Sequence, residues 1–134
     1  MKYSVVLNQE VDLGALMNAL GHVAVGLAHR APSKDQAMRT FRDKEGRLVG
    51  TMSDDPLIVL AGANSAKLSQ AHKAAEAAGL ICNAFVLDMK DGAPVDQEAA
   101  ILSRSADELL YLAVGCWGEA DEVRGAFKRF SLFR

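Results

Sequence analysis

The side chains best suited to bind a ligand or to move a proton lie in the first long amphipathic segment of the chain. Asn18 and His22 are four residues apart, so in a helix they lie on one face, one turn from each other. A histidine beside an amide can hold a defined tautomer and present it to a ligand. Alternatively, both side chains are half-buried and hydrogen-bond to neighbouring backbone groups. The sequence is consistent with either interpretation.

Asp88 and Asn8 are the other candidates, because each follows an apolar run that predicts a strand. Ligands of open α/β sheets collect at the carboxyl ends of strands. The two side chains would lie near the same edge of the sheet if their strands run parallel. Asp88 could instead start a turn before Gly92 by bonding to its own backbone. The predicted ligand-binding residues are therefore Asn8, Asn18, His22 and Asp88.

A metal site, a cofactor and a nucleophilic residue are not expected. Seven residues of helix separate His22 from His29 by about 10 Å, too far for both to bind one zinc ion through nitrogen bonds of about 2 Å. Cys82 and Cys116 lie in apolar runs without CxxC spacing and are predicted to be buried, reduced thiols. No GxxxxGK, GxGxxG or Gly-x-Ser-x-Gly motif is present, which argues against nucleotide binding and against serine hydrolase chemistry.

The candidate residues must be positioned by strands that alternate with helices. A strand over residues 2–7 precedes Asp12, a helix-capping residue, and a helix from Leu13 to about His29 with apolar residues at helical spacing. Three glycines interrupt this helix at a cost of about 1 kcal/mol each relative to alanine. They suggest that something packs or binds close to its backbone. The three are Gly14, Gly21 and Gly26.

The rest of the chain continues the alternation. The pattern predicts a hairpin with Gly46 in its turn, strands over 57–60, 80–87 and 109–117, a helix capped at Asn64 or Ser65, and a short helix from Pro94. A C-terminal helix is predicted from Glu119, with Arg124, Lys128 and Arg129 at its far end, as the helix dipole favours. The predicted fold class is α/β: a single-domain sandwich over residues 1–134, with a mixed sheet of about four main strands and helices on both faces.

Composition limits the classes of partner. The 134-residue chain carries a net charge of −2 without a basic stripe, which makes nucleic acid an unfavourable partner. No apolar run reaches membrane-spanning length and no signal peptide is recognisable, so the protein is expected to be cytoplasmic. Apolar side chains crowd the C-terminus, and part of this cluster is predicted to form a homodimer contact. They are Trp117, Phe127, Phe130, Leu132 and Phe133.

The opening strand and the run Asn18-Ala-Leu-Gly-His22 resemble a family of uncharacterised bacterial proteins, a domain of unknown function whose fold is similar to that of type II peptidyl-tRNA hydrolases. The resemblance extends over nearly the whole chain. His22 falls where those hydrolases carry a Gln-x-x-His motif, and Asp88 falls where they carry an aspartate after a strand. The run Gly14–Met17 contains no base at the place of the lysine that the hydrolases use, and their Asp-Ala-Gly-x-Thr turn is missing after Asp88.

These departures guide the functional prediction. Esterase chemistry on peptidyl-tRNA requires positive charge to stabilise phosphate and the developing oxyanion, and the first helix offers none at the place of the lysine. We therefore predict a non-hydrolase member of this fold that binds a small polar ligand or a partner near the first helix. One alternative is a divergent peptidyl-tRNA or related ester hydrolase that uses His22 and Asp88. The other is a structural or interaction module. The sequence leaves open whether the protein is an enzyme.

Overall fold

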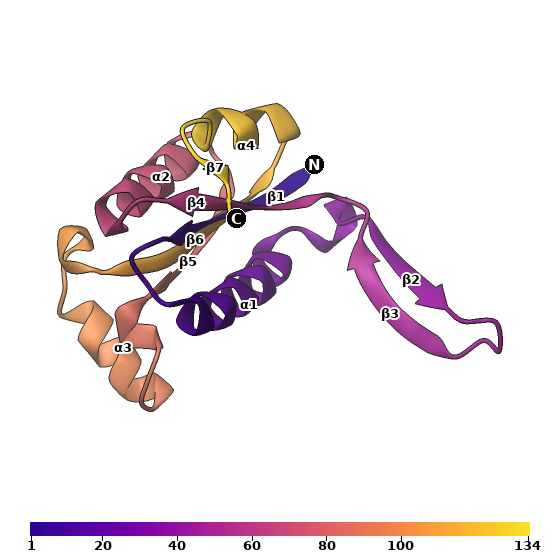
Figure 1. Cartoon of the computed structure of the whole chain (residues 1–134), viewed down its shortest axis with the longest axis horizontal. Helices are drawn as coiled ribbons and strands as arrows, with labels where there is room; N and C mark the ends of the chain where they lie inside the picture. The colour runs from indigo at the N-terminus through magenta and orange to yellow at the C-terminus, as the bar shows by residue number, and fades with distance from the viewer.

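Helices and strands alternate along the chain, as the spacing of its apolar residues predicts (Figure 1). The computed structural model describes residues 1–134. Its strands are β1 (Lys2–Asn8), β2 (Met38–Arg42), β3 (Leu48–Ser53), β4 (Leu57–Gly62), β5 (Ile81–Val86), β6 (Tyr111–Gly118) and β7 (Ser131–Leu132). Its helices are α1 (Leu13–Arg30), α2 (Ser65–Ala77), α3 (Pro94–Leu102) and α4 (Ala120–Ala126), with single helical turns at η1 (Ser33–Asp35), η2 (Leu87–Met89) and η3 (Ala106–Glu108).

Strand β1 lies in the middle of a five-stranded mixed sheet with the order β5-β6-β1-β4-β7. It pairs in parallel with β4 and antiparallel with β6. Strand β5 is antiparallel to β6, and β7 is antiparallel to β4. Because β1 and β6 have neighbours on both sides and helices above and below, nearly every residue of these two strands is buried.

Alternate residues of β1 belong to two separate apolar cores. Val5 and Leu7 pack with α1 on one face of the sheet, whereas Val6 packs with α2 and α4 on the other. The helices therefore cover both faces, as Figure 1 shows. The buried residues of α1 recur at helical spacing, as expected for one face of an amphipathic helix. They are Leu16, Ala19, Val23 and Leu27.

Capping side chains fix where the two longest helices begin. The Asp12 carboxylate accepts a hydrogen bond from the Ala15 amide at 3.1 Å, and the Asn64 side chain accepts one from the Lys67 amide at 3.0 Å. Each bond satisfies an amide that has no partner inside its helix. The predicted starts of both helices are confirmed.

Helix α1 approaches the sheet closely because two glycines leave room for it. A Cβ atom on Gly115, in β6, would lie 2.5 Å from Cγ1 of Val23 and 2.8 Å from Cδ1 of Leu27. On the helix itself, the space beside Gly26 is filled by the side chain of Asn83 from β5. The Asn83 amide donates a hydrogen bond of 3.2 Å to the carbonyl oxygen of Val23. Close packing beside the glycines of α1 is thus confirmed at Gly26, and Gly115 in the facing strand allows a second close approach.

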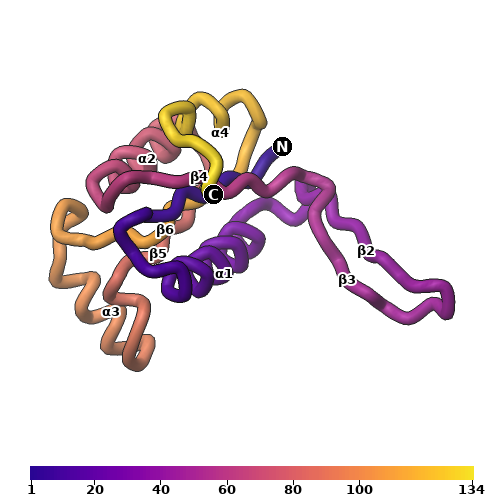
Figure 2. The backbone as a smooth tube through the Cα atoms, in the orientation of Figure 1, coloured from indigo at the N-terminus to yellow at the C-terminus, as the bar shows by residue number.

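The predicted hairpin is present and extends away from the rest of the chain, as Figure 2 shows. Its strands β2 and β3 pair only with each other. Gly46, in the turn, has a φ of 85°, a conformation that glycine adopts without strain. At the base of the hairpin, Arg39 forms hydrogen bonds of 2.8 Å from Nε and Nη2 to the two carboxylate oxygens of Asp54.

The α/β class and the mixed sheet are confirmed, with one addition and one correction at the C-terminus. Beside the four longer strands, the two-residue β7 adds a fifth strand at the edge of β4. Helix α4 ends at Ala126, so Lys128 and Arg129 lie in the turn that follows it rather than in its last turn. Short-range charge patterning favoured a longer helix, but the chain turns back to place Ser131 beside β4.

The two glycine environments lead to opposite expectations for alanine substitution. Gly115→Ala should lower the free energy of unfolding by about 1–3 kcal/mol, since the new methyl group overpacks the contact between α1 and β6. Gly21→Ala is the matched control, because Gly21 has nothing within 4 Å of its Cβ position. It should stabilise α1 by about 0.5–1 kcal/mol. Urea unfolding followed by circular dichroism measures both, and a stabilising Gly115→Ala would contradict the packing described here.

Candidate functional site

His22 lies on the exposed side of α1 and stacks against Phe85 of β5. The two ring centroids are 5.4 Å apart and the ring planes differ by 21°. Asn18, one turn earlier, is also exposed. The half-buried pair that the sequence allowed is therefore not what the structure shows. One side of the imidazole rests on an apolar ring, and the rest of it is accessible to solvent.

Asp88 lies in the turn η2 and is held by an arginine from beyond α3. Arg104 donates hydrogen bonds from Nε at 2.9 Å and from Nη2 at 3.2 Å to the two carboxylate oxygens. These bonds raise the pKa of Arg104 above its usual value. The carboxylate thus bonds to a side chain 16 residues away, and not to the backbone of its own turn as the alternative interpretation had it. A bidentate pair of this kind has a fixed geometry, and it leaves Nη1 of Arg104 available for another acceptor.

Asn8 is the only buried residue among the four predicted site residues, with 1% of its surface exposed. Its Nδ2 donates to the carbonyl oxygen of Tyr111 at 2.9 Å, and its Oδ1 accepts from the amide of Glu10 at 2.9 Å. Both ends of the amide are therefore used by backbone groups. Asn8 closes the turn between β1 and α1 and joins that turn to β6.

Asn8 and Asp88 do lie at the same edge of the sheet, as the sequence predicts. Strands β1 and β5 are both antiparallel to β6, so their carboxyl ends point the same way. Tyr111, which accepts the Asn8 hydrogen bond, pairs with Val86 two residues before Asp88. The start of β6 separates the two side chains. Asn18 and His22 are therefore exposed on α1, which packs on β5, whereas Asn8 lies in the interior.

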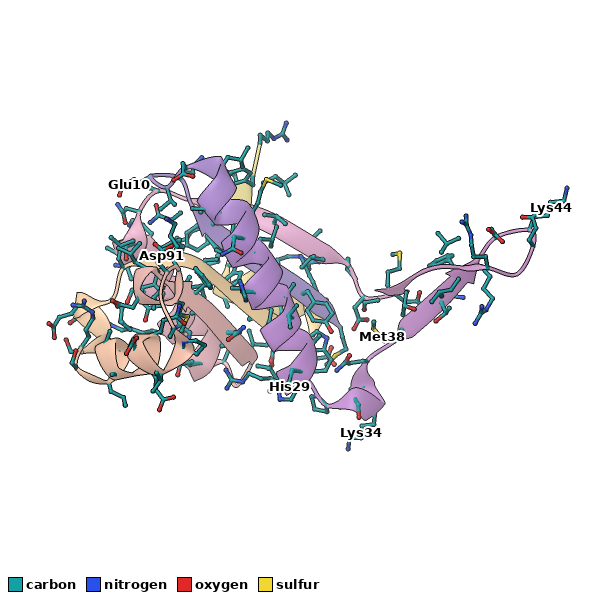
Figure 3. All side chains as sticks on the ribbon, turned by 90° about the horizontal axis from the view of Figure 1, so that it is seen from below. Glu10, His29, Lys34, Met38, Lys44 and Asp91 are labelled. Carbon is teal, nitrogen blue, oxygen red and sulfur yellow. The ribbon has the colours of Figure 1, made fainter.

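Figure 3 shows how this edge is built. Glu10 lies at the start of α1, His29 at its other end, and Asp91 on the segment that follows η2, alongside the first half of the helix. Met89, from η2, packs against both apolar cores. The turn that carries Asp88 is therefore anchored under the same helix that carries Asn18 and His22.

Two hollows lie elsewhere. One, of about 580 Å³, is bounded by α2 and by the turn between α4 and β7. The other, of about 480 Å³, lies between α1 and the base of the β2–β3 hairpin, and Met38, Met52 and Leu57 line it. Sequence reasoning predicted neither, because each is bounded by segments far apart in the chain.

Groups of three or more histidine, cysteine, aspartate or glutamate side chains placed to bind a metal ion are absent. Both cysteines are free and buried, as predicted. Burial raises the pKa of the Cys82 thiol to about 11 and that of Cys116 to about 12. Neither thiol has the ionised character that a nucleophile needs. None of the helices is both long and apolar enough to span a bilayer.

The model of the DUF2000 family, described as a protein of unknown function, matches residues 1–134. The chain belongs to the DUF2000 family. A solved structure of a protein of unknown function from Agrobacterium tumefaciens strain C58 has a similar fold, with a TM-score of 0.85 and 16% sequence identity over 99% of this chain and 97% of that one. At this identity the similarity shows the fold alone. A search of curated proteins finds no match.

In this DUF2000 chain, the sequence pattern singled out His22 and Asp88 but not Phe85 and Arg104, which contact them. Phe85 reads as an ordinary core residue, and only the crossing of α1 over β5 brings it under His22. Arg104 follows a short helix, in a run without a motif. The alternation of acidic and basic residues in this region does not specify which pairs form.

The raised thiol pKa values predict a loss of stability at alkaline pH. In the unfolded DUF2000 chain the thiols ionise near pH 8.5, whereas in the folded chain the Cys116 thiol stays protonated to about pH 12. Above pH 8.5 the unfolded state therefore binds fewer protons, and the free energy of unfolding should fall by up to about 1.4 kcal/mol per pH unit for this thiol. Urea unfolding at pH 7.5, 9 and 10 measures the slope. Cys116→Ala should flatten it, and an unchanged slope in that variant would contradict the assignment.

Proposed function

We propose that this protein is a non-catalytic binding protein that keeps a peptidyl-tRNA hydrolase-like fold and takes a small polar ligand beside α1. The ligand contacts Asn18 and His22 on the helix and the Asp88–Arg104 pair at the end of β5. The observation that carries the proposal is the bidentate hydrogen bonding of both Asp88 oxygens to Arg104. A carboxylate held in this way is a poor base, but it holds the guanidinium ready for a polar ligand.

Hydrolysis lacks support in the same region. A hydrolytic site needs a base oriented by a partner and positive charge aimed at the developing oxyanion. His22 rests on a phenylalanine ring, and the first turns of α1 carry no lysine or arginine. A divergent ester hydrolase that uses His22 and Asp88 is therefore the weaker alternative.

The exposed side of His22 fits a ligand with a planar polar group. The imidazole already stacks on Phe85 on one side, and aromatic rings favour offset stacking. The Asn18 amide, one turn away, offers both a donor and an acceptor. The ligand need not be charged. The only cation of the proposed site is Arg104, and Asp88 already neutralises it.

A thermal-shift screen of small polar metabolites tests the proposal, because a ligand stabilises the folded state by mass action. We expect at least one compound to raise the melting temperature of the wild type but not that of His22→Ala. His29→Ala is the matched control, since His29 lies at the far end of α1, and it should respond like the wild type. A screen in which every stabilising compound acts equally on His22→Ala would contradict the proposed site.

The same proteins separate binding from catalysis. Wild-type protein should not release tRNA from a peptidyl-tRNA substrate above the background rate. Turnover by the wild type that is lost in Asp88→Asn would show that the protein is a hydrolase and would overturn the non-catalytic interpretation.

We also propose that the protein forms a homodimer, through a surface different from the one that the sequence suggested. Trp117 and Phe127 are buried in the two cores of the domain, where 3% and 2% of their surfaces are exposed. The C-terminal cluster is therefore largely used inside the chain. Exposed apolar side chains lie instead on α1, on the hairpin strands and at the start of β4. They include Leu13, Met17, Met38, Met52 and Leu57.

Charge favours a second copy of the chain as the partner of this surface. The tip of the hairpin is weakly basic: it carries Arg42, Lys44 and Arg47 beside two acidic residues, one of which, Asp43, already pairs with Arg47. The start of α1 carries Glu10 and Asp12. These groups lie at opposite ends of the molecule, as Figure 3 shows for Lys44 and Glu10. When two copies pack their α1 helices antiparallel about a two-fold axis, each basic hairpin extends toward the acidic helix start of the other copy. Such an isologous contact closes on itself.

Light scattering coupled to size exclusion measures this assembly. We expect the wild type to be a dimer at high micromolar concentration and Met17→Glu combined with Leu57→Glu to be a monomer with an unchanged circular dichroism spectrum, because buried carboxylates are costly to desolvate. Val95→Glu is the matched control: it charges an exposed apolar residue of α3, 73% of which is accessible, and should remain a dimer. A monomeric wild type would contradict the proposal. Nucleic acid and membrane partners remain unfavoured, and a cytoplasmic location stays an expectation.

A further inference from the structure

A hollow on the other face of the sheet has the properties of an anion-binding site. It encloses about 580 Å³ between α2 and the turn that joins α4 to β7, and Figure 1 shows these two elements side by side on the face opposite α1. Residues from four separate parts of the chain line it, from Gln9 after β1 to Ser131 in β7. The hollow therefore exists only in the folded protein.

Three cations line this hollow, and no carboxylate does. Lys67 comes from the first turn of α2, and Lys128 and Arg129 come from the turn after α4. None of the three takes part in an ion pair, although eight such pairs occur in the chain. In a chain with a net charge of −2, three like charges around one hollow repel one another, and a bound anion would relieve that repulsion.

The walls of the hollow are shaped for more than a bare ion. Ala71 and Ala74 of α2 and Gly125 of α4 present small side chains or none, which is why space remains between the two helices. The ring of Phe130 lines another wall. The side chains of Gln70 and Ser131 supply hydrogen-bonding groups. The hollow thus combines a charged rim with an apolar surface, the usual composition of a small-molecule site.

We propose that this hollow binds a small organic phosphate. The guanidinium of Arg129 can hold two phosphate oxygens at once, and the ammonium groups of Lys67 and Lys128 neutralise the remaining charge. The organic part of the ligand lies against Phe130 and the alanines. This site is separate from the one beside α1, because it faces the opposite core of the sheet. Neither proposal depends on the other.

Isothermal titration at constant ionic strength, with three probes, tests the chemistry. Phenyl phosphate should bind more tightly than inorganic phosphate, because its ring occupies the apolar part of the hollow, and phenol should not bind. Ala74→Leu fills the hollow from an exposed position without changing any charge. It should weaken binding of phenyl phosphate more than binding of inorganic phosphate. Phenyl phosphate that binds no better than inorganic phosphate would overturn the organic part of the proposal.

Charge variants test the residues. Arg129→Gln should lower the affinity for phenyl phosphate about tenfold or more, the loss expected for a charge-assisted hydrogen bond. Lys128→Gln should lower this affinity to a smaller degree. Arg42→Gln and Lys44→Gln remove the same charges from the hairpin and are the matched controls; they should bind like the wild type. All four positions are exposed, so the fold should survive, which circular dichroism confirms. Absence of binding to the wild type at millimolar phenyl phosphate, or equal weakening in the controls, would overturn the site.

Discussion

The close approach of α1 to the sheet is the constraint on which the other features of the structure depend. It requires that Gly115 present no side chain to Val23 and Leu27 and that Asn83 fit beside Gly26. Because α1 lies close to the sheet, the imidazole of His22 reaches the ring of Phe85 in β5 and stacks on it. A helix held farther out would leave the imidazole without support and the core open.

Local signals in the sequence were sufficient for most of the fold. Asp12 and Asn64 marked helix starts because capping acts within three residues. The run from Val5 to Leu7 marked a strand, and its apolar residues do not alternate with polar ones because the strand is covered on both faces. The C-terminal helix was predicted too long, because its charge pattern suits a helix whether or not the chain has to turn back to the sheet. That turn depends on a pairing between Ser131 and Ala61, which a local pattern does not contain.

The contacts made by the predicted site residues could not be inferred from the sequence. Asn18 and His22 followed from helical spacing, and Asp88 from its place after a strand. What each carboxylate or amide binds depended on contacts over long sequence separations: Asp88 with Arg104, and Asn8 with Tyr111. The sequence does not show whether a polar side chain is free to bind a ligand or is already hydrogen-bonded inside the protein. The hollow between α2 and α4 was invisible for a related reason, since its three cations come from segments about 60 residues apart in the chain and meet only through the fold.

The hairpin formed by β2 and β3 has one further consequence. Its two ends meet at the body of the protein, where the amide of Asp54 donates a hydrogen bond of 2.6 Å to the carbonyl oxygen of Ala37. No strand of the main sheet pairs with it. A segment that leaves and re-enters a domain at one point behaves as an insertion, because its length can change without altering the register of any other strand. This is the part of the chain where related proteins can differ most in length while keeping the same sheet, and where a fluorescent or affinity tag can be placed with least disturbance to the rest of the molecule.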